Sequence, residues 1–288
     1  MIPILKATAK AVFARLPFWL QIHLARGNPS AAFYIRKSPA RTLIIDYYLK
    51  KYQVEIDSSV DIQRRMLSGK YEEDTLAIVQ RLVRPGDTCI DIGANVGAIT
   101  IALADRVGSS GRVEAFEPGS VFFNRLKKNL SLNPELEKIV HIHQVALADK
   151  RGELPWQESK VYTGTASMYS GVHEPTAPTL RLPVARLDGY LPIQNLKQIH
   201  FIKIDVDGLE REILKGSEGL LRQFHPTLYV ETTLWNSEMK EAAKEIEQYL
   251  HGLGYELYKV LNQNGDLAPT RYPDFSMNTV AIHPERKG

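Results

Sequence analysis

A glycine-containing segment, CIDIGANVGAIT at residues 89–100, has the residue types of a ligand-binding turn. A strand-like apolar run ends at Asp91, and Gly93 and Gly97 follow before a helix-like run begins. Glycines at these positions let the backbone turn sharply and approach a ligand closely. The Asp91 carboxylate would repel a pyrophosphate but attract an ammonium group. The turn therefore indicates a ligand with an amino-acid end rather than a dinucleotide.

A second acidic residue, Glu117, ends the strand-like segment GRVEAFE. At the tip of the second strand of a βαβ unit, a carboxylate commonly accepts hydrogen bonds from ribose hydroxyls. A lone glycine turn is often only a connection between a strand and a helix, so the interpretation depends on the turn and Glu117 occurring together. An amino acid and a ribose in one ligand predict S-adenosylmethionine as the cofactor, and methyl transfer as the reaction.

Carboxylates at the ends of later strands are candidates for chemistry on the methyl acceptor. A hydroxyl is a poor nucleophile while protonated, and a positioned base contributes about 10²- to 10⁴-fold. Asp205, after FIKI, is our first candidate for the base or for orienting the acceptor, and Glu231, at the end of TLYVE, is the second. Asp207 is a third, although Asp207 and Glu210 have the spacing of helix-capping residues in a helix that begins at Gly208.

Metal binding is less well supported by the sequence. Two neighbouring carboxylates could hold a divalent ion, but no third ligand can be identified, and we assign no metal ligands. Lys203 alternates with Ile202 and Ile204 and is assigned a structural role. The eight histidines have no spacing typical of a metal site, and His141 and His143 are assigned to the core or edge of a sheet.

The segments around these residues alternate between strand-like and helix-like patterns. This alternation predicts a parallel sheet covered by helices on both faces, with ligands beyond the carboxyl ends of the strands. Residues 150–198 interrupt it, and we expect a functional insertion or a small strand pair there, with TGTASMYSG at 163–171 in the acceptor pocket. The expected strands are 88–92, 111–117, 139–147, 201–206, 227–231, 255–260 and 278–283, and the helices between them are 97–107, 120–133, 208–221 and 237–254.

Six segments follow one another in the order and spacing of a known family: DIGANVGAIT, VEAFEP, NLSLN, VALADKRGEL, IKIDVDGLEREILKG and LYVE. Over about residues 71–283 the chain resembles the FkbM-type methyltransferases. The resemblance implies an α/β fold, the Rossmann-like class I methyltransferase sheet of seven strands with the last one antiparallel. It also implies methyl transfer to a hydroxyl of a sugar or a secondary metabolite. The family usually has glutamate at the position of Asp207, so the side chain here has a shorter reach.

The same resemblance implies which residues hold the cofactor. The family's YE dipeptide matches Tyr71 and Glu72, so Glu72 either reaches the methionine end or is an exposed residue in the first turn of a helix. Ala146 and Leu147 would lie beside the adenine. The complete expected set is Glu72, Asp91, Gly93, Ala94, Asn95, Gly97, Glu117, Pro118, Ala146 and Leu147.

Composition limits the class of protein and its partners. With 44% hydrophobic and 24% charged residues, the chain has the composition of a globular protein, and its single cysteine excludes an internal disulfide. Seven cations and no anion precede Asp46, so removing +7 from the net charge of +3 leaves about −4 for the remainder. A slightly acidic remainder disfavours nucleic acid as a partner. We expect a small-molecule or glycan acceptor and a cytoplasmic location; the sequence leaves the oligomeric state open.

The chain is expected to divide into a basic, helical N-terminal arm or cap at residues 1–70 and the methyltransferase domain at residues 71–288. Residues 1 to about 80 have helical patterns, including PFWLQIHLAR after Leu16. Two other functions remain alternatives at this point. An N-methyltransferase could use the same fold with an acid that orients an amine, and an NAD-dependent oxidoreductase could use a similar sheet. A non-catalytic membrane-docking module is a third alternative, although Asp205 and Glu231 are intact.

The N-terminal arm either lies on a membrane surface or packs on the core, and a binding measurement separates the two. One helical face would carry Leu5, Ala9, Val12, Phe13 and Leu16. Because each nearby cation contributes about 1 kcal/mol at an anionic surface, a docking arm should bind anionic liposomes at low salt and detach as salt rises. Deleting residues 1–26 should then abolish cosedimentation with little change in melting temperature. A sharp drop in melting temperature without liposome binding would identify a structural cap.

Overall fold

The computed structural model describes residues 16, 18–25, 42–58, 60–157, 179–206, 208–234, 236–275 and 277–286. The chain divides into two compact units, Met1–Glu73 and Asp74–Gly288. None of the helices in the described ranges has the length and apolar character needed to cross a membrane.

The N-terminal unit contains a β-hairpin where the sequence pattern predicted helix. Its helix α2 (Phe18–Ala25) agrees with the helix expected in PFWLQIHLAR, whereas the proposed helical face from Leu5 to Phe13 lies outside the described residues. Strands β1 (Thr42–Tyr48) and β2 (Tyr52–Asp57) then pair antiparallel, before the short helices α4 (Asp61–Arg65) and η1 (Met66–Ser68). The prediction of helix throughout was therefore wrong for residues 42–57.

The alternation of side chains in β2 explains this difference. Tyr52, Val54 and Ile56 are buried, whereas the intervening Gln53 and Glu55 are not. A period of two places one face of a strand against a core, and β-branched and aromatic residues favour that arrangement.

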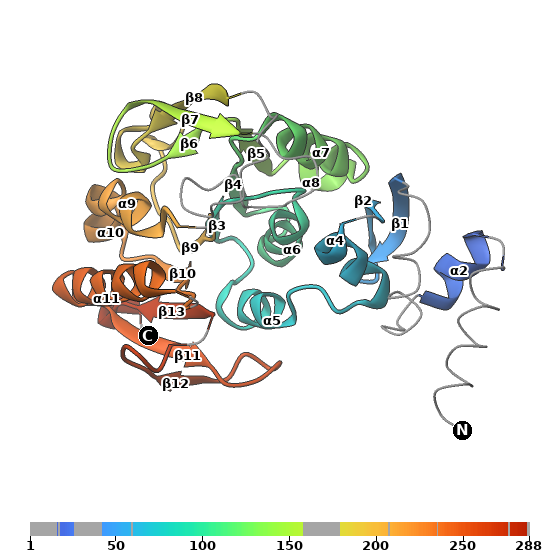
Figure 1. Cartoon of the computed structure of the whole chain (residues 1–288). Coiled ribbons are helices and arrows are strands. Elements are labelled where there is room, and N and C mark those ends of the chain that lie inside the picture. Colours follow the sequence, from blue (N-terminus) through green and yellow to red (C-terminus); the bar gives the residue numbers. More distant parts are fainter. Residues whose placement is uncertain are drawn as a thin grey trace. The chain divides into compact units, whose positions relative to one another are not determined.

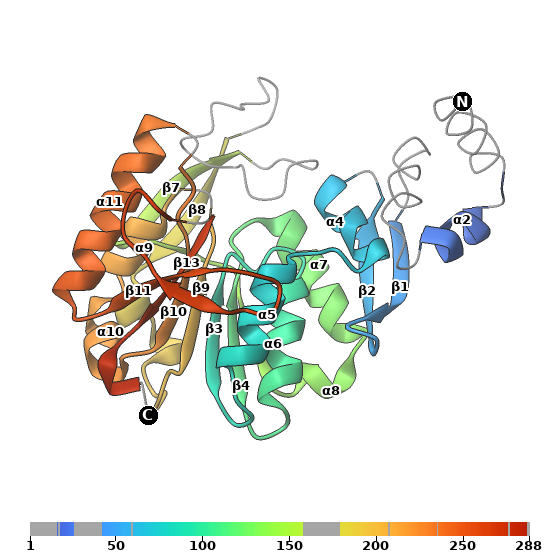
Figure 2. The ribbon, with the colours of Figure 1, turned by 90° about the horizontal axis from the view of Figure 1, so that it is seen from below.

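The second unit is built on a large mixed sheet (Figures 1 and 2). Its strand order is β12-β11-β13-β10-β9-β3-β4-β5. Strands β5, β4, β3, β9 and β10 run parallel, and β13 runs antiparallel to its neighbours β10 and β11. The class I methyltransferase fold is confirmed, with the short β12 as an eighth strand beside the seven expected. The strands are β3 (Thr88–Ile92), β4 (Arg112–Phe116), β5 (Val140–His143), β9 (Phe201–Ile204), β10 (Thr227–Glu231), β11 (Glu256–Val260), β12 (Leu267–Pro269) and β13 (Asn278–Ile282).

Helices cover both faces of this sheet, as the alternating pattern predicted (Figure 2). The helices α5, α6 and α7 lie on one face, and α9, α10 and α11 lie on the other. Central strands are consequently buried on both sides: Ile90, Ile202 and Leu228 are fully buried, as is the single cysteine, Cys89. The helix bounds are α5 (Glu73–Leu82), α6 (Ala98–Val107), α7 (Ser120–Ser131), α8 (Pro134–Glu137), α9 (Glu210–Lys215), α10 (Glu218–Phe224) and α11 (Ser237–Gly252).

The insertion after β5 carries a small sheet of its own. The single strand expected at residues 139–147 is divided, because β5 ends at His143 and β6 (Ala146–Leu147) pairs with a different sheet. This three-stranded sheet has the order β6-β8-β7, with β7 (Gly152–Gln157) and β8 (Thr179–Ala185) antiparallel. The small strand pair expected in the insertion is thus present. The segment 163–171, predicted to line the acceptor pocket, lies outside the described residues.

Candidate active site

The strand order itself locates the candidate site. From β3 the chain continues to β4 and β5 on one side, and later returns through β9 on the other side of β3. In open parallel sheets, ligands bind beyond the carboxyl ends of the strands where the order reverses in this way. The turn after β3 and the residue after β9 both lie at this edge.

The turn after β3 has a positive φ at both of its glycines, and a close backbone contact excludes a side chain at Gly93. Gly93 has φ 79°, and a Cβ atom there would lie 1.9 Å from the backbone oxygen of Asp205. Gly97 has φ 87°, and its Cβ would lie 2.6 Å from Leu126 Cδ1. The backbone N–H groups of Gly93 and Ala94 both donate to Phe116 O at 3.0 Å, which ties the turn to β4. The turn is therefore held between the ends of β4 and β9.

Replacing Gly93 by alanine is expected to disrupt this turn. The new Cβ would clash with the Asp205 carbonyl and force it to move. Alanine in a left-handed conformation also costs roughly 1–2 kcal/mol. Gly69 offers a matched control, because it has a left-handed backbone (φ 69°, ψ 16°) and nothing within 4 Å of a built Cβ. Thermal unfolding and calorimetry should show Gly93→Ala to be less stable than Gly69→Ala and to bind S-adenosylhomocysteine weakly. Equal behaviour of the two variants would contradict a close contact at Gly93.

Glu117 follows β4 and is bound to the same turn. Its Oε2 accepts the N–H of Asn95 and its Oε1 accepts the N–H of Gly119, both at 2.9 Å. Burial raises the pKa of Glu117 from 4.5 to about 7, although the Gly119 and Asn95 N–H groups and the Lys203 charge oppose this. Each carboxylate oxygen keeps a second lone pair. The predicted hydrogen bonds from ribose hydroxyls to Glu117 are compatible with this geometry and stay a prediction. The expected contact of the half-buried Pro118 with the cofactor also stays a prediction.

A pH profile tests the role of Glu117. Because its pKa is raised on folding, the folded state holds more protons than the unfolded state between about pH 4.5 and about 7, so this group's contribution to stability falls as pH rises there. Ribose hydroxyls instead need the ionised acceptor, so affinity for S-adenosylhomocysteine should rise over the same window.

Glu117→Gln should flatten this affinity profile and weaken binding at pH 8 by about 2 kcal/mol. Calorimetry at several pH values measures both effects, with the exposed Glu135→Gln as the control. An unchanged profile in a folded Glu117→Gln protein would remove Glu117 from the cofactor site.

Lys203 joins the turn at residues 93–97, the candidate cofactor turn, to the candidate base. Its side chain is 3% exposed, and Nζ lies 3.4 Å from Asp91 Oδ1 and 3.3 Å from Asp205 Oδ2. The same ammonium donates to Gly93 O at 3.1 Å. One buried cation thus contacts two carboxylates and the cofactor turn. These buried contacts are consistent with the structural role expected for Lys203. Its partner Asp91 was not predicted, because only the strand register places the two residues directly opposite one another.

Asp91 is fully buried in this arrangement. Its Oδ2 accepts the Thr100 hydroxyl at 2.6 Å. Its Oδ1 is near Lys203 but has no aligned hydrogen bond from any described residue. The ammonium group beside Asp91 is therefore that of Lys203. A direct contact with the amino group of a ligand would require Asp91 to be uncovered, and that contact stays a prediction.

The structure brings the two leading catalytic candidates to neighbouring strand ends. Ile204 in β9 is in register with Val230 in β10, so the residues that follow them, Asp205 and Glu231, occupy adjacent positions at the edge. The Asp205 side chain is 33% exposed, which leaves it accessible to an acceptor. Asp207 lies outside the described residues.

The helix expected to begin at Gly208 begins later. Helix α9 starts at Glu210, and its N-cap residue Leu209 provides no side-chain cap. The buried carboxylate of Glu210 instead accepts the N–H groups of Val206 and Gly208. Burial raises the pKa of Glu210, and these N–H groups oppose that shift. Glu210 therefore closes the loop after β9, which is a structural role.

The sequence analysis did not predict a partly buried cluster of polar and aromatic side chains that lies beside Glu117. His143 Nε2 lies 2.5 Å from Glu114 Oε2, and its Nδ1 lies 3.3 Å from the Tyr190 hydroxyl. The Phe116 ring stacks on His143 with centroids 4.6 Å apart. Burial, and then the charge of Glu114, raises the pKa of Tyr190. Both ring nitrogens of His143 thus have polar partners, as expected for a histidine with a structural role. The His143 ring also packs with Phe116 and Tyr190 near the ends of β4 and β5.

The remaining cofactor candidates lie in two different places. Ala146 and Leu147 are buried in β6 and pair with Val184 and Ala185 of the small sheet. Their predicted position beside the adenine stays a prediction. Glu72 belongs to the N-terminal unit, so its predicted contact with the methionine end also stays a prediction.

Comparison with known proteins is consistent with this geometry. Residues 91–257 match the family model of the methyltransferase FkbM domain. Methyltransferase sdnD of Sordaria araneosa is 26% identical over 218 residues, covering 66% of this chain and 80% of that protein. The hexuronic acid methyltransferase AglP of Haloferax volcanii is 23% identical over 175 residues, which cover 61% of this chain and 67% of that protein.

Two solved structures are similar at lower identity. The methyltransferase FkbM from Methylobacillus flagellatus is 12% identical with a TM-score of 0.43, over 77% of this chain and 52% of that chain, so this chain spans about half of its length. The O-methyltransferase from Bacillus cereus, in complex with S-adenosylhomocysteine, is 15% identical with a TM-score of 0.43, over 74% of this chain and 80% of that one.

The family match covers the candidate cofactor turn, Glu117, the buried Lys203 and both candidate bases. It therefore identifies the reaction as methyl transfer and the cofactor as S-adenosylmethionine. The resemblance seen in the sequence is confirmed, and the chain belongs to the FkbM-domain family of methyltransferases.

Proposed function

We propose that this protein transfers the methyl group of S-adenosylmethionine to a hydroxyl group of a sugar, a glycan or a secondary metabolite, with Asp205 as the general base. The observation that carries the proposal is the position of Asp205. Its partly exposed carboxylate lies at the reversal of strand order, and its backbone oxygen contacts the cofactor turn at Gly93. A base in this place is beside the methyl donor and open to an acceptor.

The chain's own residues account for the steps that transfer requires. A bound sulfonium supplies an already activated methyl group, so the protein must align the acceptor oxygen in line with it and remove one proton. Asp205 is the group that takes this proton. Lys203 fixes the Asp205 carboxylate relative to Gly93, because the same ammonium contacts both. Glu231 at the adjacent strand end orients the acceptor or replaces Asp205 as the base.

Chemistry and one relative support the proposed class of acceptor. A hydroxyl requires a base at the moment of transfer, and the partly exposed Asp205 provides one. The Haloferax relative is a hexuronic acid methyltransferase, which favours sugars, including acidic sugars, among the candidate acceptors. Transfer to nitrogen on the same fold is the alternative, in which Asp205 would orient an amine.

Matched acceptors distinguish these functions. The protein is incubated with S-adenosylmethionine carrying a deuterated methyl group and with pairs of sugars and their amino-sugar analogues, uronic acids, and hydroxylated metabolites. Mass spectrometry with fragmentation then locates the label on oxygen or nitrogen. Label on a hydroxyl supports the proposal. Label only on amines would establish N-methyl transfer. Cofactor binding without transfer to any hydroxyl acceptor would contradict the proposed O-methyl transfer.

A further inference from the structure

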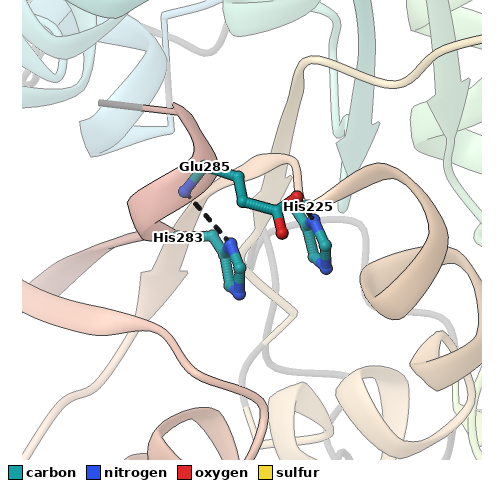
Figure 3. A group of neighbouring side chains, drawn as sticks. All are labelled: His225, His283 and Glu285. Carbon is teal, nitrogen blue, oxygen red and sulfur yellow. Dashed lines mark hydrogen bonds and ion pairs between the residues drawn. The ribbon is translucent and has the colours of Figure 1, made fainter. Parts of the chain in front are cut away.

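Two imidazoles and a carboxylate, from His225, His283 and Glu285, lie close together (Figure 3). They are at the end of the large sheet opposite the candidate active site. His225 follows α10 and precedes the first residue of β10, Thr227, whereas His283 directly follows the antiparallel β13. Glu285 lies in the short helix η4 (Pro284–Arg286). The cluster is therefore at the amino ends of the parallel strands, whereas Asp205 follows a carboxyl end.

The three side chains present their donor atoms to one another. Among the described residues they form a set whose possible ligand atoms all lie within 4.8 Å of each other. His225 Nδ1 is 2.7 Å from Glu285 Oε2. The backbone N–H of Glu285 donates to His283 Nδ1 at 3.4 Å, so this nitrogen has a lone pair that a metal ion would take in place of a long hydrogen bond. The rings stack with centroids 3.8 Å apart, an arrangement that two cationic imidazoles would oppose.

The backbone around the cluster is held in place by several separate contacts. Arg286 donates to Phe224 O and Ile199 O at 3.0 Å and to His225 O at 3.3 Å, which fastens η4 to the end of α10. His225 itself has a left-handed backbone, with φ 46°. A Cβ atom on Gly254 would lie 2.9 Å from His283 Nε2, so this ring is confined on its far side.

We propose that His225, His283 and Glu285 bind one divalent transition-metal ion of the zinc type. Two imidazole nitrogens and one carboxylate oxygen are a ligand set that suits Zn²⁺ and its neighbours in the transition series. Binding uses the lone pair of His225 Nδ1, so the proton between Nδ1 and Glu285 moves to Nε2 of the same ring or, from an imidazolium, to solvent. Metal-to-nitrogen distances of about 2.0–2.1 Å require the donors to converge, so the two rings, 7° from parallel, must turn relative to one another. The 69% exposed Glu285 side chain can follow that movement. Water completes the coordination.

The ion has a structural consequence rather than a part in methyl transfer. Its ligands come from the end of α10, the end of β13 and η4, so it connects the C-terminal segment to the sheet. The site is at the opposite ends of the strands from Asp205, and methyl transfer should therefore proceed with or without it. This separation makes the proposal independent of the acceptor and of the catalytic base.

The test uses the full chain without an affinity tag, treated with a chelator and then titrated with Zn²⁺, and with Co²⁺ as a spectroscopic probe. We expect one equivalent of Zn²⁺ by calorimetry and a melting temperature that stops rising at that ratio. Ligand-field bands of bound Co²⁺ should disappear when Zn²⁺ is added. Loss of a residue that only hydrogen-bonds to a metal ligand typically weakens metal binding about 10- to 100-fold. Glu285→Gln and His225→Asn each remove a ligand and should weaken Zn²⁺ binding by more than that.

The variants are chosen to keep the fold. Glu285 is exposed, and asparagine tolerates the left-handed conformation at position 225. His251→Gln is the matched control, because His251 also lies near a glutamate, Glu247, at 3.7 Å, but on the exposed surface of α11. It should leave Zn²⁺ binding unchanged. No stoichiometric binding to the wild-type chain, or equal binding by Glu285→Gln and His225→Asn, would overturn the proposal and leave the cluster as an ion pair beside a ring stack.

Discussion

Asp205→Asn is expected to lower turnover at least about a hundredfold while affinity for S-adenosylhomocysteine stays near that of the wild type. Asparagine keeps the shape of the side chain but cannot accept the proton of the acceptor hydroxyl. The Asp205 side chain is 33% exposed, and the contact with Gly93 is made by its backbone oxygen, which the substitution retains. The loss should therefore appear in kcat rather than in cofactor binding.

Steady-state kinetics and calorimetry on the same preparations measure these two quantities. Glu231→Gln is the matched variant, because Glu231 ends the neighbouring strand and is the other candidate base. A large loss in Asp205→Asn with a small one in Glu231→Gln assigns the base to Asp205. Normal turnover of Asp205→Asn would contradict that assignment, and a loss confined to Glu231→Gln would transfer the role to Glu231.

Lys203→Met is expected to reduce the free energy of unfolding by about 3 kcal/mol, because it leaves a buried carboxylate without its counter-charge. Asp91 is fully buried, and the Lys203 side chain is only 3% exposed, so water does not replace the lost cation. Gly93 O would also lose its hydrogen bond from Nζ. Chemical denaturation at pH 7 measures this change.

A double variant separates charge from packing in this result. In Lys203→Met with Asp91→Asn the buried charge is removed, and the amide oxygen of the introduced asparagine can still accept the Thr100 hydroxyl, so most of the lost stability should return. The exposed pair Lys244–Glu241 provides the control, and Lys244→Met should cost less than about 0.5 kcal/mol. If the double variant is no more stable than Lys203→Met alone, the loss comes from packing and not from the unpaired Asp91.

Much of the second unit could be predicted because its signals are local. The alternation of apolar strands with amphipathic helices identified the α/β class, and β3, β10 and α11 were expected within two residues of their observed bounds. The candidate residues of the cofactor turn, together with Glu117, Asp205 and Glu231, were identified because each ends or follows a strand. Residues at strand ends can be recognised from the sequence pattern of the strand itself.

The N-terminal hairpin was not predicted, because its stability depends on contacts that are not local in the sequence. The alternating pattern of strands β1 and β2 was included in a region read as helical. What stabilises them is burial of one face, with Ile45 paired opposite Val54, and that core exists only once the strands have paired. Tertiary contacts here decided between helix and strand.

The sequence alone determined which residues end the strands, and therefore which chemical groups reach the edge of the sheet. Only the tertiary structure decided which of these groups meet, because the order and register of strands join residues far apart in the chain. Pairing of β3 with β9 sets Lys203 opposite Asp91. Pairing of β10 with β13, with Leu228 opposite Ala281, brings the residues before one strand beside those after the other, and so His225 meets His283. Such contacts depend on backbone hydrogen bonding between distant segments, which no spacing within either segment records.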